Sequence, residues 1–160
     1  MRKAFYMENH IEKVRAYVDD VLLHMTDTIE KRCACVHLYG VAQACAMIAR
    51  KRKENAELAI IAGMLHDIYA YKTSDRSDHA HKGAAMAKDI LKELEAFSDS
   101  EIETICGAIY DHSDKAEKQS PFVEILKDAD VLQHCLYDPC KPVAEHEQKR
   151  FENLKREFGL

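Results

Sequence analysis

Apolar residues recur along this chain at the spacing of three and four that amphipathic helices show, rather than at the alternating spacing of half-buried strands. The first such segment, from about Met7 to Glu30, carries one apolar stripe formed by Ile11, Val14, Val18, Val21, Leu22 and Met25. Only five glycines and three prolines occur, which leaves few turn signals for strands. The pattern predicts an all-α helical bundle of about six or seven helices.

Two segments are expected at the centre of this bundle. The segment from about Cys33 to Lys51 is rich in alanine, and its small residues, such as Ala42, would allow another helix to approach closely. The segment from about Ala56 to Tyr69 is apolar on nearly all sides. A helix without a polar face is a buried one, so this segment is predicted to be the central helix.

Four further helices are predicted nearer the C-terminus. They run from about Lys82 to Phe97, from Ser98 to Tyr110, from Phe122 to Cys135 and from Val143 to Phe158. Ser98 and Glu101 have the spacing of a capping box. The last helix is highly charged, but its apolar residues share one stripe, and we expect that stripe to pack on the core of the same chain.

Composition limits the classes of protein to be considered. A chain of 160 residues with 47% hydrophobic content is long enough for one well-filled core, so residues 1–160 are predicted to form a single domain. The net charge of −5 argues against a nucleic-acid polymer or an anionic membrane as a partner. No apolar run approaches the length of a membrane span. The pattern does not indicate an oligomeric state.

The N-terminal residues lack the apolar stretch of a signal peptide. The six cysteines include no CxxC pair, and a domain of this size does not need disulfides for stability. We therefore expect reduced thiols and a cytoplasmic protein.

The pair His66-Asp67 ends the apolar run that starts at Leu58. An imidazole and a carboxylate are costly to bury together unless something compensates them, and a metal ion is a common compensator. The pair therefore indicates a metal site. A helix-terminal capping role for Asp67 is the simpler alternative.

Four more polar residues lie among apolar neighbours, where each would be costly without a shared purpose. They are His37, His79, His112 and Asp130. His81 competes with His79 for one role, because residues two apart on a helix point to different faces. The spacing of His79 from Gly83-Ala84, where small side chains leave room, favours His79.

The order of these residues resembles the H…HD…D signature of the HD-domain superfamily of metal-dependent phosphohydrolases. The resemblance extends from about Arg32 to Leu132 and rests on three stretches, namely His37, Ala62-Gly63-Met64-Leu65-His66-Asp67-Ile68 and Ala129-Asp130-Val131-Leu132. It implies an HD-type helical fold in which His37, His66, Asp67 and Asp130 bind one metal ion. In members with two ions, two further histidines lie between the HD pair and the last aspartate, at positions that His79 and His112 match. Asp67 would then bridge the ions.

The resemblance includes small bacterial HD proteins that hydrolyse diadenosine tetraphosphate. It also includes the cyclic-dinucleotide phosphodiesterases of the HD-GYP group, but the GYP motif is absent here. The implied function is hydrolysis of a small phosphorylated substrate, most simply a nucleotide, by metal-activated water, with Asp67 as the catalytic residue. Lys82 and Lys127 are candidate contacts to substrate phosphate, although such lysines are more often solvated or paired.

The implied cofactors are divalent metal ions, two in number if the extra histidines take part. Imidazole and carboxylate ligands suit transition metals better than calcium or magnesium. Iron or manganese is preferred here, while zinc, cobalt and nickel are also compatible. Two alternative functions use the same ligands, namely an HD-type di-iron oxygenase and a non-catalytic metal-binding regulatory module.

Overall fold

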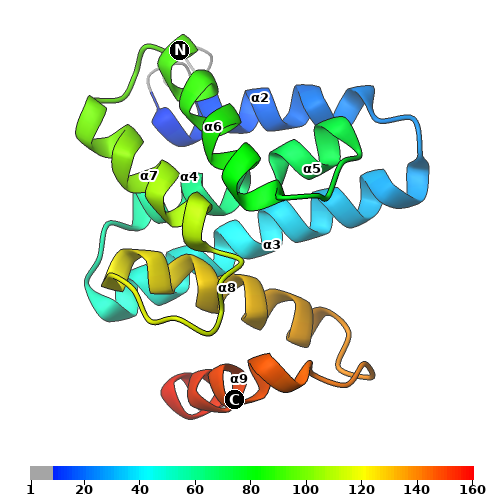
Figure 1. Cartoon of the computed structure of the whole chain (residues 1–160), viewed down its shortest axis with the longest axis vertical. Helices are drawn as coiled ribbons and strands as arrows, with labels where there is room; N and C mark the ends of the chain where they lie inside the picture. The colour runs from blue at the N-terminus through cyan, green and yellow to red at the C-terminus, as the bar shows by residue number, and fades with distance from the viewer. Residues whose placement is uncertain (1–8) are drawn as a thin grey trace.

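The chain folds as helices packed around α3 (Thr28–Arg52) and α4 (Ala56–Leu65) in a computed structural model that describes residues 9–160 (Figure 1). This part of the chain contains eight helices and no strand, which confirms the predicted all-α fold. The other six are α2 (His10–His24), α5 (Ile68–Thr73), α6 (His79–Glu93), α7 (Asp99–Asp111), α8 (Pro121–Tyr137) and α9 (Glu145–Phe158).

Side chains with an oxygen acceptor begin most of these helices by accepting hydrogen bonds from free backbone N–H groups. The predicted capping box of Ser98 and Glu101 is present at α7. Asp27 caps α3 in the same way. This cap explains why the predicted first helix, about Met7 to Glu30, was too long: α2 ends at His24, and the chain turns before Asp27. Its predicted start at Met7 lies outside the described residues.

The prediction of a single helix over 56–69 is wrong, because the helix is interrupted at His66 and Asp67. Helix α4 ends at Leu65 and α5 begins at Ile68, while Asp67 has φ −112° and ψ 10°, outside the helical region. On one continuous helix, neighbouring side chains point about 100° apart. The break lets His66 and Asp67 face the same space, and it accounts for the additional helix.

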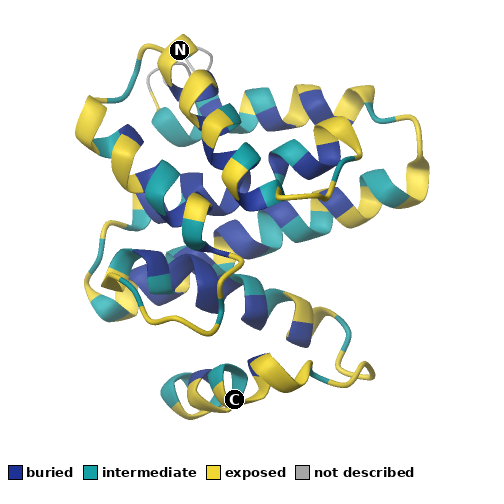
Figure 2. Cartoon of the chain, viewed as in Figure 1, coloured by how far each residue is buried: buried dark blue, intermediate teal, exposed yellow. Residues whose placement is uncertain are grey.

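Helix α4 is the most buried element, as predicted, with seven of its ten residues buried. Buried residues gather where the helices face one another (Figure 2). Helix α4 lies very close to α3, where Gly63 faces the backbone of Ala42. The expected close approach at the small residues of α3 is thus confirmed. By length and composition α3 could also cross a membrane, but here its apolar residues Leu38, Val41 and Ile48 are fully buried in the bundle.

Helix α9 covers α8 from the outside (Figure 1). Leu154 is buried, and Phe151 and Phe158 pack against the core, as predicted for this stripe. Arg52 at the end of α3 reinforces the contact with ion pairs to Asp128 of α8 (2.7 Å) and Glu157 of α9 (2.7 Å). Helix α9 is therefore joined to α8 and α3 by both apolar and charged contacts.

Candidate metal centre

The six residues predicted as metal ligands converge from five helices or helix ends. His37 lies on α3, His66 and Asp67 form the break between α4 and α5, His79 opens α6, His112 follows α7, and Asp130 lies on α8. His66 and His112 are only 0% and 2% exposed, respectively. Four imidazoles and two carboxylates thus share one largely buried space.

Four of these residues surround a first possible ion position. The Nε2 atoms of His37 and His66 lie 3.1 Å apart. His37 Nε2 is 3.4 Å from Asp67 Oδ2 and 3.4 Å from Asp130 Oδ1, and His66 Nε2 is 3.5 Å and 3.9 Å from the same two oxygens. Two imidazole nitrogens and two carboxylate oxygens therefore face one point.

The other oxygen of Asp67 faces a second possible ion position. Asp67 Oδ1 is 3.4 Å from His112 Nε2 and 3.5 Å from His79 Nε2. The rings of His79 and His112 meet edge to face, with centroids 5.2 Å apart. Asp67 is thus the residue shared by both groups, with one oxygen directed to each.

All four histidines present Nε2 to the centre because their Nδ1 atoms are engaged elsewhere. An oxygen acceptor lies near each Nδ1: Gln133 Oε1 at 2.8 Å for His37, Gly63 O at 2.8 Å for His66, Arg76 O at 3.3 Å for His79 and Ile109 O at 2.6 Å for His112. Such acceptors place the ring hydrogen on Nδ1. The Nε2 lone pairs are then free, which is the arrangement that metal-binding histidines show.

The donor set fits divalent metal ions on two further observations. Asp67 Oδ1 is buried and accepts no hydrogen bond from the described residues, an arrangement that is costly unless a cation satisfies the oxygen. Donors bound to one ion at about 2.1 Å lie about 3.0–3.4 Å apart in octahedral or tetrahedral geometry. The separations given above are 3.1–3.9 Å, and the donors of His37, His66 and Asp130, like those of His66, Asp67 and His112, lie within 4.8 Å of one another, whereas His79 belongs to neither of these sets.

The pKa shifts of His66 and Asp67 favour the neutral imidazole and the ionised carboxylate that metal ions require. Burial lowers the pKa of His66 to about 4, so this imidazole is neutral near pH 7. Burial raises the pKa of Asp67, but the nearby imidazoles of His66, His112 and His37 outweigh it and hold the pKa well below its usual range. For His37, burial lowers the pKa, and Asp67 and Asp130 more than reverse the effect. The raised pKa of His37 means that a proton competes with a metal ion for this imidazole.

Two residues that sequence reasoning missed support the ligands. Gln133 lies three residues after Asp130 on α8 and bonds His37. Its side chain fills the space beside Gly40, where a Cβ atom would be only 2.8 Å from Gln133 Cγ. Lys115, with its side chain 6% exposed, donates to Asp130 Oδ2 at 2.6 Å. The i, i+3 spacing on α8 could have indicated Gln133; nothing in the loop sequence distinguishes Lys115.

Replacing Gln133 with leucine should weaken metal binding by about 10–100-fold, the usual effect of losing an outer-shell partner of a metal-binding histidine. The reason is that the His37 ring loses the acceptor that fixes its Nδ1–H. A competition titration with a chromophoric chelator measures the affinity. Gln43→Leu, at an exposed position of α3, is the matched control and should leave it unchanged; equal affinity in the Gln133 variant would contradict the role.

The remaining predicted residues lie apart from the centre or beside it. His81 is paired with Asp78 at 2.7 Å and stacks on Tyr110, so the geometry favours His79 as the ligand. Lys127 is fully buried and donates to Glu117 O at 2.9 Å, which leaves it no access to a substrate. Lys82 binds Asp75 at 2.8 Å and Ser77 at 3.0 Å in the loop before α6; its contact with a substrate stays a prediction.

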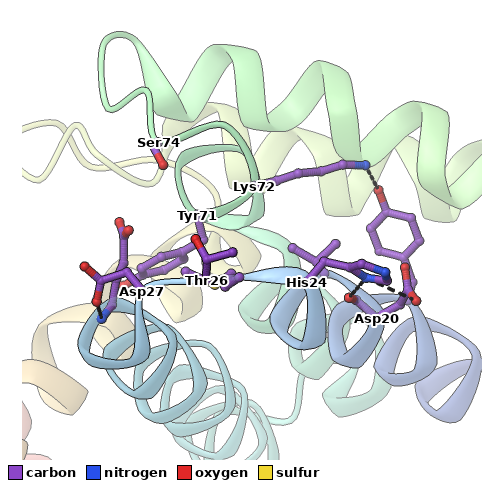
Figure 3. A pocket seen from close by; sticks show the side chains of 11 residues that line it. Asp20, His24, Thr26, Asp27, Tyr71, Lys72 and Ser74 are labelled. Atoms are coloured by element: carbon purple, nitrogen blue, oxygen red, sulfur yellow. Dashed lines mark hydrogen bonds and ion pairs between the residues drawn. The ribbon is translucent and has the colours of Figure 1, made fainter.

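A cavity of about 430 Å³ is lined by residues of α2, the start of α3 and α5 (Figure 3). Tyr71 lines it, and the Tyr71 ring also meets His37 edge-on, with centroids 6.5 Å apart. The carboxylates of Asp20, Asp27 and Glu30 line the same cavity. One aromatic residue thus joins the cavity to a predicted metal ligand.

The sequence matches the HD domain family over residues 35–134, which include all six predicted ligands. The match covers more than half of the chain, and the chain therefore belongs to the HD-domain family. HD domains are helical, typically bind divalent metals and include metal-dependent phosphohydrolases. No solved structure matches the chain significantly.

Proposed function

We propose that this protein is a metal-dependent phosphohydrolase with a two-ion centre, acting on a small phosphorylated substrate that is most simply a nucleotide. The observation that carries the proposal is the position of Asp67, whose two oxygens face two separate sets of imidazoles. Iron or manganese is the preferred metal for both ions, since the donors are imidazoles and carboxylates without a thiolate.

His37, His66, Asp67 and Asp130 would hold one ion, and Asp67, His79 and His112 the other. Ions held in this way lower the pKa of water and neutralise charge that develops on phosphoryl oxygens. The protein contributes rigid positions: the Nδ1 hydrogen bonds orient the rings, and Lys115 holds Asp130 Oδ2 so that Oδ1 faces His37. Donors that are already placed need no reorganisation during the reaction.

The cavity beside Tyr71 supports a nucleotide as the substrate. Its volume of about 430 Å³ falls in the usual range for small-molecule sites. Carboxylates on its wall would accept hydrogen bonds from ribose hydroxyls and exocyclic amino groups, whereas they would repel further phosphates. We propose that the nucleoside part lies here and the phosphate lies at the centre.

Removal of the metal should abolish phosphate release. Protein purified without chelator is assayed for phosphate or nucleotide release on nucleoside phosphates, dinucleoside polyphosphates and sugar phosphates. Dialysis against chelator should then remove the activity, and manganese or ferrous iron should restore it, because the reaction needs an ion to activate water.

Elemental analysis of the same samples links activity to metal content. Full activity in metal-free protein would contradict the proposal. An oxygen electrode provides the second arm of the experiment: oxygen consumption without phosphate release would favour the di-iron oxygenase instead. A metal-loaded protein that is inert in both assays would favour the regulatory module.

A further inference from the structure

A second group of potential metal donors lies at the other end of α8, between α8 and α9. His134, Cys135 and Glu147 place one donor atom each within 4.8 Å of one another. None of the three belongs to the predicted centre, although His134 Nδ1 is 4.0 Å from Asp130 Oδ1. The cluster therefore lies close to the predicted centre but shares no donor residue with it.

Glu147 is the residue that most requires a partner. Its side chain is 9% exposed, and its nearest partner among the described residues is His134 Nε2 at 2.8 Å, followed by His146 Nε2 at 3.9 Å. Within residues 9–160, no lysine or arginine comes within ion-pair distance of Glu147. A carboxylate taken out of water without a permanent cation is costly, so the environment favours a bound cation.

There is also space for an ion and its remaining ligands. A cavity of about 240 Å³ is lined by all three donors together with the chain that connects α8 to α9. Cys135 is a free thiol, 8% exposed. The simpler interpretation is that His134 and Glu147 form an ordinary hydrogen bond between the two helices and that Cys135 is a buried thiol beside it. This interpretation assigns no role to the cavity that the three side chains line.

We propose that His134, Cys135 and Glu147 form a separate site for a borderline divalent ion, zinc by its ligand type, which ties α9 to α8. Thiolate, imidazole and carboxylate together are a zinc ligand set, and water from the cavity would complete four-coordination. Binding releases the Cys135 thiol proton to solvent. Metal binding replaces the hydrogen bond between His134 Nε2 and Glu147: the hydrogen on Nε2 is exchanged through solvent for one on Nδ1, and the two donor atoms separate by a few tenths of an ångström. This proposal does not rest on the phosphohydrolase function.

Cobalt substitution separates the two metal sites, because cobalt bound to a thiolate has a near-ultraviolet charge-transfer band that imidazole and carboxylate ligands do not produce. Cobalt titrated into the full-length protein should give this band. Cys135→Ser should lose it. His134→Ala, at an exposed position where packing is little affected, should also lose or weaken it. Cys140→Ser is the matched control, since Cys140 is exposed in the neighbouring turn, and should retain the band.

Zinc content from equilibrium dialysis gives a second measurement: wild type should retain one ion per chain more than Cys135→Ser and Glu147→Gln. Circular dichroism of each variant checks the fold. Absence of the band in wild type, or its survival in Cys135→Ser, overturns the site. Either result leaves the predicted centre untouched, because that centre contains no cysteine.

Discussion

Asp67→Asn should abolish metal-dependent turnover, with a loss on the order of 10³-fold or more in kcat, equivalent to about 4 kcal/mol. Asparagine keeps the size of the side chain, but it is neutral and presents only one oxygen, so it cannot serve both groups of imidazoles. The variant should also lose the rise of about 5–10 °C in Tm that saturating metal gives a domain of this size. Steady-state kinetics and thermal melts with and without manganese measure both effects.

Asp111→Asn is the control for Asp67→Asn. Asp111 precedes the predicted ligand His112, but no hydrogen bond or ion pair of its carboxylate occurs among the described residues. Its activity and its metal-induced rise in Tm should match those of wild type. If Asp67→Asn kept both properties, Asp67 would not bridge ions, and the two-ion proposal would fail even though the family assignment would stand.

The helices could be predicted from the sequence because their signals are local. Apolar spacing located most of the helices, and the capping box of Ser98 and Glu101 located the start of α7. The break between α4 and α5 was not predictable in this way, since the run from Ala56 to Tyr69 has the composition of one helix. The break places His66 and Asp67 in the same space as His37 from α3, a contact between distant parts of the chain that local apolar spacing does not encode.

The candidate centre, too, could be predicted only in part from the sequence. Its six donors could be chosen from the sequence because polar groups in apolar surroundings are costly and their order matched a known signature. Their supporting partners depend on tertiary packing: Lys115 comes from an irregular loop, and Gln133 reaches His37 only because Gly40 leaves room. The sequence favoured His79 over His81 only through its spacing from Gly83-Ala84; the start of α6 then places His79 3.5 Å from Asp67, while His81 pairs with Asp78.

Gly63→Ala should destabilise the protein by about 2 kcal/mol and lower Tm by about 4–8 °C. A Cβ atom at Gly63 would lie 2.8 Å from Ala42 Cα and 2.9 Å from Ala42 N, and these are backbone atoms that cannot rotate away. Overpacking of this kind costs about 1–3 kcal/mol or more, which exceeds the gain of about 1 kcal/mol from the better helix propensity of alanine. Urea unfolding and thermal melts measure the difference.

Gly107→Ala isolates the propensity effect, because a Cβ atom at Gly107 in α7 meets nothing within 4 Å. This control should stabilise the protein by about 0.5–1 kcal/mol, so the two substitutions should have opposite signs. Gly63→Ala should additionally weaken metal binding, since Gly63 O accepts the Nδ1–H of His66 and any shift of α4 away from α3 separates His66 from His37. If Gly63→Ala stabilised the protein as Gly107→Ala does, α3 and α4 would be able to move apart at no cost in free energy. The short distance between His37 and His66 would then not depend on glycine at position 63.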